Sequence, residues 1–472
     1  MPPERQRPYL FYDLTLSLCS TCLRRVEAKV LIEDDRVVLS KRCPEHGPQR
    51  ALLADDAAYY RRSREVFLKR SEQPLRFNTA EHWGCPYDCG ICPGHEQHTC
   101  LGIIEINDHC NLRCPVCYAG SGPERPEHRP LAEVERMLDV LVANEGEPDV
   151  VQLSGGEPTL HPDFFAILDA AKRRPIRHLM VNTNGLRIAS DPAFAERLAS
   201  YGPGFEVYLQ FDSLHEAALR TLRGADLRDV RRRALDRLDA LGLSTTLVVT
   251  VMKGVNDGEL GELIDFALTR PCVRGVTFQP VQRAGRADGY DPALHRLTLT
   301  EVRRRILEQT EVFKPADILP VPCHPDAIAM AYALKTGSGA VPLTGLIDPA
   351  VLIAGGRNTI IYEKDPVVRE KLFRLLSTAN SPEGGAARLK DLLCCLPRLS
   401  VPAEVGYKDL FRLIIMQFMD VEAFDVRSVK KSCVHMVRPD GRIIPFDTYN
   451  LLYRDGLEKD VLEPLRAAAA AS

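Results

Sequence analysis

Three cysteines lie close together directly after a short apolar run. Cys110, Cys114 and Cys117 have the spacing C-x3-C-x2-C and follow the apolar residues 101–106. Three thiolates can bind three irons of a [4Fe-4S] cube and leave the fourth iron without a protein ligand. Because such an iron can bind a substrate or cofactor, the spacing predicts a catalytic cluster. Spacing alone also allows a structural zinc knuckle, or three small apolar residues in a core.

A second motif follows another apolar run further along the chain. Residues 150–160 read VVQLSGGEPTL, which places Gly155, Gly156, Glu157 and Pro158 where a strand should end. The segments LMVNTNG and VYLQFDSL repeat this pattern of an apolar run that ends in polar residues. Taken in this order, the motifs resemble those of the radical S-adenosylmethionine (SAM) superfamily.

The resemblance implies a role for each motif. In that superfamily the three cysteines carry a [4Fe-4S] cluster, SAM binds the open iron through its amino and carboxylate groups, and the GGEP segment binds the SAM amine. Glycines allow backbone carbonyls to approach a ligand, and Glu157 offers an acceptor for an ammonium group. Tyr118 is expected to contact adenine, since Val116 stands where the superfamily often has an aromatic residue.

Polar residues after later strands are expected to contact the ribose or methionine part of SAM. Helix capping and turn formation are the ordinary alternatives for such residues. The expected cofactor-binding residues are Tyr118, Gly155, Gly156, Glu157, Pro158, Asn182, Asn184, Asp212, Ser213 and Asn256.

The N-terminal cysteines form a separate group. Cys19 and Cys22 precede residues 23–42, whose alternating pattern predicts a hairpin, and Cys43 and His46 follow them. Two such knuckles predict a tetrahedral site with three sulfur ligands and one nitrogen ligand, of the zinc-ribbon or rubredoxin kind. Zinc is the ordinary occupant, and iron remains an alternative.

A third group repeats the catalytic spacing. Cys85, Cys89 and Cys92 have the spacing C-x3-C-x2-C, and Cys100 follows eight residues later. With a fourth ligand present, the group predicts a closed auxiliary [4Fe-4S] cluster, with a zinc site as the alternative.

The whole order of motifs is similar to that of the tetraether lipid synthase family. Further metal ligands are expected among the scattered cysteines Cys323, Cys394, Cys395 and Cys433, which lie beside loop-forming residues and would hold a third cluster. Some relatives have cysteine where this chain has Asp447, so that cluster would need an oxygen ligand, the second cysteine of the 394/395 pair, His324 or an open site. Cys272 is expected to be an inert buried thiol.

Apolar runs and amphipathic helical patterns alternate through the middle of the chain. They predict an α/β fold, an incomplete (β/α)6 barrel of the TIM type, with the motifs on the loops after the strands. The stretch YKDLFRLIIMQFMDVEAF predicts a helix, which either packs in the core or lines an apolar substrate channel. Strands are predicted at residues 101–107, 150–154, 178–183, 206–211, 245–252 and 275–280.

These patterns divide the chain into four parts. Residues 1–75 form the N-terminal knuckle domain, 76–100 the auxiliary-cluster segment, 101–310 the partial barrel, and 311–472 a C-terminal domain for an auxiliary cluster and substrate binding. The chain of 472 residues is 45% apolar and has a net charge of −3, which argues against non-specific nucleic-acid binding. The first ten residues lack a signal-peptide core, no apolar run reaches membrane-span length, and cysteine spacings that suit metal ligands indicate a cytoplasmic protein.

The resemblance implies a specific reaction. A 5'-deoxyadenosyl radical would remove hydrogen from lipid hydrocarbon chains, and two chain ends would be coupled by a carbon-carbon bond. A low-potential reductant such as ferredoxin or flavodoxin is expected, and the lipid substrate implies peripheral contact with a membrane. Radical modification of a peptide or small metabolite is the alternative. A non-catalytic iron-sulfur electron carrier or redox sensor is a third, but a carrier needs no SAM site.

Overall fold

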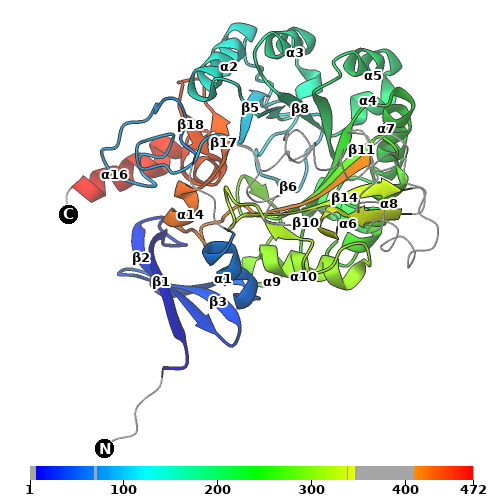
Figure 1. Ribbon diagram of the computed structural model, residues 1–472. Helices are drawn as coiled ribbons and strands as arrows, with labels where there is room; N and C mark the ends of the chain where they lie inside the picture. The colour runs from blue at the N-terminus through cyan, green and yellow to red at the C-terminus, as the bar shows by residue number, and fades with distance from the viewer. Residues whose placement is uncertain (1–6, 68–71, 337–338, 346–408, 471–472) are drawn as a thin grey trace, which may run out of the picture.

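The computed structural model describes residues 7–67, 72–336, 339–345 and 409–470. A small N-terminal sheet lies beside a much larger mixed sheet, and most of the other described elements pack on this larger sheet (Figure 1). Within the described residues, no helix combines the length and the apolar composition of a membrane span.

The N-terminal sheet has four antiparallel strands in chain order. The predicted hairpin is present, because the second and third strands pair and residues 34 and 35 form the turn between them. A short helix follows and packs against the third strand. The elements are β1 (Leu10–Leu18), β2 (Arg25–Glu33), β3 (Arg36–Cys43), β4 (Gly47–Ala54) and α1 (Ala57–Glu65).

Six parallel strands form the body of the large sheet, and they confirm the six strands expected from the sequence. They are neighbours in chain order, and nearly all of their residues are buried, as expected where helices or other chain cover both faces. The strands are β5 (Leu101–Asn107), β7 (Val150–Gly155), β8 (His178–Thr183), β9 (Phe205–Gln210), β10 (Thr245–Val251) and β11 (Val273–Pro280).

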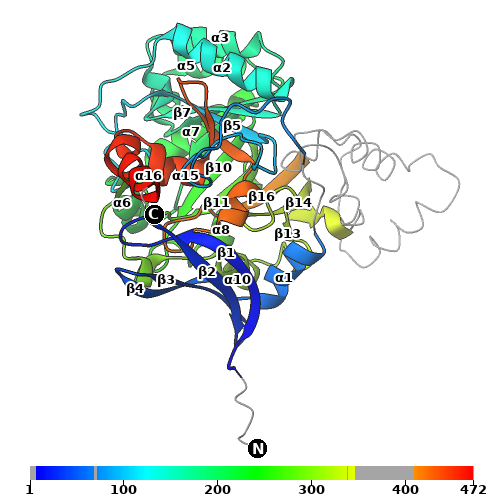
Figure 2. The ribbon, with the colours of Figure 1, turned by 90° about the vertical axis from the view of Figure 1, so that its left-hand side faces the viewer.

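Helices connect these strands and cover the outer face of the sheet (Figures 1 and 2). Ile104 and Ile106 of β5 pack outward into the core shared with the helices, whereas Leu101 and Ile103 belong to the core inside the barrel. The helices are α2 (Leu131–Glu145), α3 (Phe164–Lys172), α4 (Leu186–Ser190), α5 (Pro192–Ala199), α6 (Glu216–Arg223), α7 (Arg228–Leu241), α8 (Leu260–Thr269), α9 (Pro292–His295) and α10 (Leu299–Gln309).

The C-terminal part of the chain extends the same sheet at both ends. β16 (Leu410–Met416) pairs parallel with β11 and antiparallel with β14 (Ile328–Thr336). At the other end β17 (Val434–Val437) pairs parallel with β5 and antiparallel with β18 (Ile443–Pro445). Residues 311–472 are therefore continuous with the barrel where the structure describes them.

The predicted helix in the stretch YKDLFRLIIMQFMDVEAF is wrong, because this stretch contains strand β16. All seven residues of β16 are buried, including Arg412. Because both faces of this run are covered, its sequence has no period that distinguishes a strand from a buried helix.

Short elements complete the described chain. β6 (Val116–Cys117) pairs with β12 (Arg286–Ala287), and β13 (Leu319–Pro320) and β15 (Gly339–Pro342) pair with β14. The remaining elements are the 3-10 turns η1 (Pro158–Leu160) and η2 (Leu343–Gly345), helices α14 (Val426–Lys430), α15 (Phe446–Thr448) and α16 (Glu463–Ala470), and the π-helical segments η6 (Tyr449–Tyr453) and η7 (Glu458–Leu462).

Candidate active site

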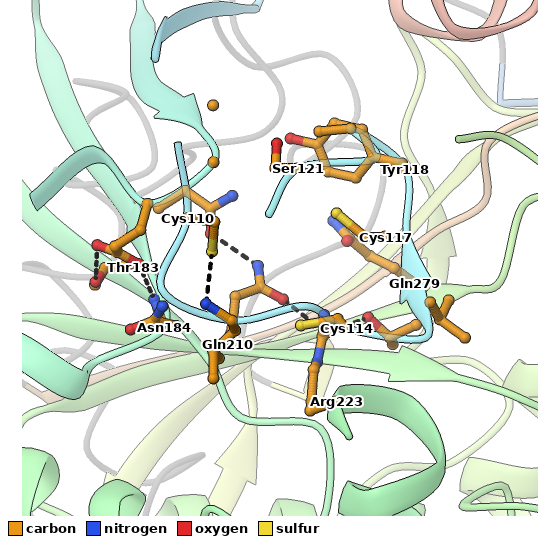
Figure 3. Close-up of a pocket in the computed structure, with 18 of the residues that line it drawn as sticks. Cys110, Cys114, Cys117, Tyr118, Ser121, Thr183, Asn184, Gln210, Arg223 and Gln279 are labelled. Atoms are coloured by element: carbon orange, nitrogen blue, oxygen red, sulfur yellow. Dashed lines mark hydrogen bonds between the residues drawn. The ribbon is translucent and has the colours of Figure 1, made fainter. Parts of the chain in front are cut away.

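The loops after the parallel strands surround one cavity. Cys110, Cys114 and Cys117 line it together with Asn184 (Figure 3). Asn182 also lines it, and the cavity with its opening to solvent contains about 1010 Å³ of empty space. The structure thus brings the catalytic cysteines to the carboxyl ends of the strands, as the barrel architecture requires. Gly155, Gly156, Glu157 and Tyr118 also line the cavity.

The cysteine loop is held by groups outside it. Arg286 donates hydrogen bonds to the carbonyl oxygens of Cys114 and Gly120, each at 3.0 Å. Asn107, the last residue of β5, donates from Nδ2 to the carbonyl oxygen of Glu157 at 2.8 Å. These bonds hold the loop backbone in place and so fix the positions of its three cysteines.

The two glycines of the GGEP segment are required by close packing against the cysteine loop. A Cβ atom at Gly155, whose φ is +131°, would lie 2.2 Å from the carbonyl oxygen of Asn107, and a Cβ atom at Gly156 would lie 2.2 Å from that of His109. Gly156 N donates to Asn107 O at 2.8 Å. The glycines therefore join the two loops, in addition to the expected contact with the SAM amine.

The carboxylate of Glu157 is fully engaged with the protein. Its Oε1 accepts hydrogen bonds from Thr159 Oγ1 at 2.6 Å and Thr183 Oγ1 at 2.7 Å, and its Oε2 accepts from Asn184 N at 2.7 Å. Burial raises the pKa of Glu157, and these hydrogen bonds act against the rise. A carboxylate offers about four acceptor positions. These hydrogen bonds position the Glu157 carboxylate between two strand ends, and its expected contact with the SAM amine stays a prediction.

A row of polar side chains crosses the strand ends beside the cavity. Tyr118 Oη and Asn182 Nδ2 each contact Ser154 Oγ, at 3.2 and 3.1 Å. Gln210 Nε2 donates to Asn182 Oδ1 at 2.7 Å, and Arg223 Nη2 donates to Gln210 Oε1 at 3.0 Å. Each amide is therefore oriented by its neighbour, and Asn182 occupies its expected place in the cavity wall.

Arg223 is a cavity residue that the sequence did not reveal. Its Nε donates to the buried Asp212 Oδ2 at 2.7 Å, and it lies next to Cys114 (Figure 3). Burial raises the pKa of the Cys114 thiol, and the Arg223 guanidinium counteracts this rise. Burial also raises the pKa of Cys110 to about 12. A fixed cation beside the thiols favours the thiolate form, which binds iron.

Four of the expected cofactor residues do not line the cavity, namely Pro158, Asp212, Ser213 and Asn256. Asp212 pairs with Arg223, and Ser213 donates to Glu259. Asn256 accepts from Met252 N at 2.9 Å and donates to Asp212 O at 3.0 Å. Pro158 begins a 3-10 turn. These contacts hold the loops in the way that the turn-forming alternative describes, and the contacts of these residues with SAM stay a prediction.

Tyr118 lies in the cavity wall, as expected, with its ring packed between other groups. Its centroid is 5.1 Å from that of Phe446, edge to face, and the Arg454 guanidinium lies 5.4 Å from the Tyr118 ring centroid. Arg454 is itself held by a buried ion pair with Glu105 at 2.7 Å. The contact of Tyr118 with adenine stays a prediction.

Several lining residues were missed for different reasons. Gln210 and Gln279 lie at the ends of β9 and β11, where the strand-end argument could have found them. Phe418 and Phe446 pack with ring centroids 3.9 Å apart and come from the C-terminal part of the chain, which carried no local signal for the cavity. Thr183, Arg231 and Gln282 are also among the missed residues.

The N-terminal knuckles form a compact site. The ligand atoms of Cys19, Cys22, Cys43 and His46 all lie within 4.8 Å of one another. The Cys22 and Cys43 sulfurs are 3.9 Å apart, and Cys43 Sγ is 3.5 Å from His46 Nδ1. Three sulfurs and one imidazole nitrogen at these separations suit a tetrahedral ion.

The other cysteines are grouped differently from the expectation. Cys85, Cys89 and Cys92 line a second cavity without Cys100. Cys100 instead lies with Cys323 and Cys433, and these three sulfurs are within 4.8 Å of one another. The reason is strand pairing, because the backbone N–H groups of Cys100 and Leu101 both donate to Cys433 O, at 2.9 and 3.0 Å.

Asp447 stands where some relatives have a cysteine, and its carboxylate already has a backbone partner. Asp447 is buried, which raises the pKa of its carboxyl to about 6, and its Oδ1 accepts from Met419 N. Its neighbour Thr448 contacts Cys89 Sγ at 2.9 Å. Cys394 and Cys395 lie outside the described residues. Cys272 is buried, as expected.

Comparisons with known proteins agree with this site. The family described as the radical SAM superfamily matches residues 104–267, and the HMPTM N-terminal zinc ribbon domain matches residues 11–55. The chain belongs to the radical SAM superfamily. It is a radical SAM enzyme with an N-terminal zinc ribbon, and its family implies a [4Fe-4S] cluster and SAM, for which the three thiols and the adjoining cavity provide a fitting site.

One relative extends over the whole chain. The 7,8-dihydro-6-hydroxymethylpterin dimethyltransferase of Methanocaldococcus jannaschii is 31% identical over 96% of this chain and 96% of its own. The GTP 3',8-cyclase of Alkaliphilus oremlandii is 28% identical over 52% of this chain and 72% of its own. Streptococcus suis SuiB aligns with a TM-score of 0.37 at 19% identity over 44% of this chain and 45% of its own. None of these relatives supports the expected tetraether lipid synthase.

Proposed function

We propose that this enzyme uses a SAM-derived radical to methylate a small flat heterocycle of the pterin class. The observation that carries the proposal is the likeness to a pterin dimethyltransferase over 96% of both chains, which includes the zinc ribbon and the C-terminal strands as well as the barrel. A small metabolite was one of the substrate classes that the sequence left open.

The walls of the cavity support a flat polar substrate. The rings of Phe418 and Phe446 offer an apolar surface against which a heterocycle stacks. Gln279 and Gln282 lie in the same wall. Gln282 donates its amide N–H to Met419 O, while its buried Oε1 has no hydrogen-bond partner within the described part of the chain. This oxygen is an acceptor for an N–H group on the edge of a heterocycle.

The residues of the chain have defined tasks in this reaction. When bound, the reduced cluster and SAM supply a 5'-deoxyadenosyl radical, which takes a hydrogen atom from a substrate carbon. Cys110, Cys114 and Cys117 would hold the cluster, and Arg223 balances their negative charge at close range. Phe418 and Phe446 exclude water from the substrate. The substrate carbon would then bond to a methyl group while the bond between that methyl group and its one-carbon donor breaks. A low-potential carrier such as ferredoxin or flavodoxin would supply one electron to the cluster and one to the released donor.

Coupling of lipid chains is the second candidate. The order of the cysteine motifs suggested it, and the paired rings of Phe418 and Phe446 give it an apolar wall. It would add a lipid substrate and a peripheral contact with a membrane. The two candidates differ in their products, so one assay can separate them.

The test uses the full chain, reconstituted anaerobically with iron and sulfide and supplied with SAM, dithionite and a reduced folate that carries a methyl group as the one-carbon donor. A reduced hydroxymethylpterin with deuterium at its ring and side-chain carbons should yield deuterated 5'-deoxyadenosine and a methylated pterin, both measured by mass spectrometry. Cys114→Ala should abolish both products, while Cys92→Ala should retain SAM cleavage and lose methylation. Unlabelled 5'-deoxyadenosine and an unchanged pterin, with coupled chains formed from added lipid, would instead support the second candidate.

A further inference from the structure

The segment that brings Phe418 to the cavity has no regular secondary structure of its own. Residues 417–425 (the 417–425 loop) connect β16 to α14. Phe418 lines the cavity, and the carbonyl oxygen of the next residue, Met419, accepts a hydrogen bond from Gln282. The position of this loop therefore sets the position of two groups offered to the substrate, the Phe418 ring and the Gln282 amide.

A buried lysine of the zinc ribbon holds one side of this loop. Lys41 of β3 is 3% exposed, and its Nζ donates to the carbonyl oxygens of Val421 at 2.8 Å and Glu422 at 3.0 Å. The same Nζ donates to Leu18 O at 2.5 Å within the ribbon. Hydrogen bonds from a charged donor are stronger than those between neutral groups, and they are stronger in a protein interior than in water. One ammonium group thus joins the ribbon to the loop.

An arginine of the barrel makes a second connection between the ribbon and the loop. Arg296 Nε lies 2.9 Å from Oδ2 of the buried Asp420, and Arg296 Nη1 donates to Leu52 O of β4 at 2.6 Å. Asp420 Oδ1 accepts from Ala423 N at 3.0 Å, so this carboxylate also fixes the backbone within the loop. The ribbon, the loop and the barrel therefore meet at one guanidinium group.

The end of the loop is held by the first strand of the ribbon. Thr15 of β1 donates from Oγ1 to Oδ1 of the buried Asp425 at 2.6 Å. Asp425 also caps α14 by accepting from Arg427 N at 3.0 Å, and α14 packs against β1, beside the N-terminal sheet (Figure 1). Strands β1, β3 and β4 of the ribbon thus each contact the loop directly or through Arg296.

The ribbon can support the loop because it is itself fixed to the barrel. Asp55 follows β4, and its backbone N–H donates to Thr300 Oγ1 of α10 at 2.9 Å. The guanidinium carbon of Arg303, from the same helix, lies 4.4 Å from the ring centroid of Tyr59 in α1. The ribbon therefore connects a barrel helix with the 417–425 loop.

We propose that the zinc ribbon positions the substrate wall of the active site, with Lys41 and Arg296 as its positioning residues. The inference rests on the proposed function for the identity of the substrate. Lys41 also connects the two metal-binding knuckles, because Leu18 directly precedes Cys19 and Lys41 lies two residues before Cys43. The contacts that hold the ribbon together therefore also hold the loop.

The SAM side of the cavity is held by other groups. Arg286 donates to Cys114 O, and Glu157 N donates to His109 O at 2.8 Å, so both donors to the cysteine loop belong to the barrel. Loosening the 417–425 loop should therefore weaken substrate binding while SAM is still cleaved at the ordinary rate. The radical would then meet a misplaced substrate, so more SAM would be cleaved for each methylated product.

The test compares Lys41→Met with Lys29→Met in the full chain. Methionine has a side chain of similar length to lysine but donates no hydrogen bond, and Lys29 is an exposed residue of the neighbouring strand β2. Hydrogen–deuterium exchange, followed by mass spectrometry, should become roughly tenfold faster across residues 417–425 in Lys41→Met and stay unchanged in β5 and β8. Lys29→Met should match the unmodified enzyme throughout.

Kinetics give a second readout that a merely structural role would not produce. In the methylation assay Lys41→Met should raise the KM for the pterin roughly tenfold, while 5'-deoxyadenosine formed without substrate should stay within about a factor of two. Asp420→Asn should produce the same split, because it removes the charge that faces Arg296 and keeps an oxygen for Ala423 N. This variant lies outside the ribbon, so it decides the question if Lys41→Met fails to fold.

Unchanged exchange across residues 417–425 in both Lys41→Met and Asp420→Asn would overturn the proposal. An equal fall in SAM cleavage with and without substrate would also overturn it, because the ribbon would then support only the fold as a whole. The exchange measurement does not depend on the substrate. If the pterin is not methylated, faster exchange in Lys41→Met would still support the positioning role, and the proposed function alone would fail.

Discussion

Replacing Gly156 with alanine should separate the packing role of the GGEP segment from its contact with SAM. The added Cβ would lie 2.2 Å from His109 O, 2.6 Å from His109 C and 2.7 Å from Asp108 O. All three atoms belong to the backbone of the cysteine loop, and none is the end of a flexible side chain. Ordinary contact distances require the loop and the GGEP turn to separate by roughly 1 Å, and overpacking of this kind costs about 1–3 kcal/mol.

This displacement acts directly on the reaction, because Cys110 directly follows His109. A misplacement of about 1 Å in a catalytic arrangement reduces a rate by roughly 100-fold. We therefore expect Gly156→Ala to form 5'-deoxyadenosine about 100 times more slowly than the unmodified enzyme, with the melting temperature lowered by a few degrees.

The matched control is Gly258→Ala. A Cβ at Gly258 meets no atom within 4 Å, so the same change should alter stability by less than about 0.5 kcal/mol and leave the rate unchanged. Rates would be measured anaerobically by liquid chromatography at equal cluster content, with stability from thermal unfolding. A Gly156→Ala rate within a factor of three of the unmodified enzyme, with an unchanged melting temperature, would refute the argument from loop packing.

Three further predictions concern buried charges. Arg223→Lys keeps the positive charge beside Cys114 but loses the planar fork of hydrogen bonds, so 5'-deoxyadenosine formation should fall roughly tenfold. Glu206→Gln breaks a buried ion pair with Arg412, whose atoms are 2.7 Å apart, and should lower the free energy of unfolding by about 3–5 kcal/mol in denaturant titrations. Burial lowers the pKa of Lys335 to about 8 in the folded protein. Between about pH 8 and 10 the unfolded chain therefore binds more protons than the folded one, so the free energy of unfolding should rise by up to about 3 kcal/mol across that range. Lys335→Met should lack this rise.

Exposed residues serve as controls for these changes. Arg220 lies one turn before Arg223 and pairs with Glu216 at the surface, so Arg220→Lys should leave the rate unchanged. Glu308 pairs with Arg304 at the surface, so Glu308→Gln should change stability by less than about 1 kcal/mol. If the buried and exposed substitutions changed rate and stability equally, burial would not explain the effects. If Lys335→Met kept the rise in stability with pH, that rise would come from another group.

The barrel strands and the catalytic cysteines could be predicted because their signals are local. Residues 101–107 and 178–183 are apolar runs of strand length, and each coincides with a strand of the structure. The spacing of Cys110, Cys114 and Cys117 is contained in one loop. Such patterns depend only on neighbouring residues and need no knowledge of the rest of the fold.

The errors concern information that is distributed along the chain. Cys100 lies beside Cys433 because strands β5 and β17, which are far apart in sequence, pair with each other. Its short distance from Cys92 along the chain had instead predicted that it belongs with Cys85, Cys89 and Cys92. Arg223 is the last residue of helix α6 and reaches the cavity from there. Because arginines at helix ends are usually exposed, its sequence position did not indicate a cavity residue. The sequence motif also did not show that the Glu157 carboxylate accepts hydrogen bonds from hydroxyl and backbone groups at two neighbouring strand ends.

The pairing of β17 with β5 also has a consequence during synthesis. The two strands are separated by about 330 residues, so one edge of β5 stays unpaired until almost the whole chain has left the ribosome. At about 5–20 residues per second this interval lasts roughly 20 to 60 seconds. During that time an apolar strand edge is exposed to wrong partners.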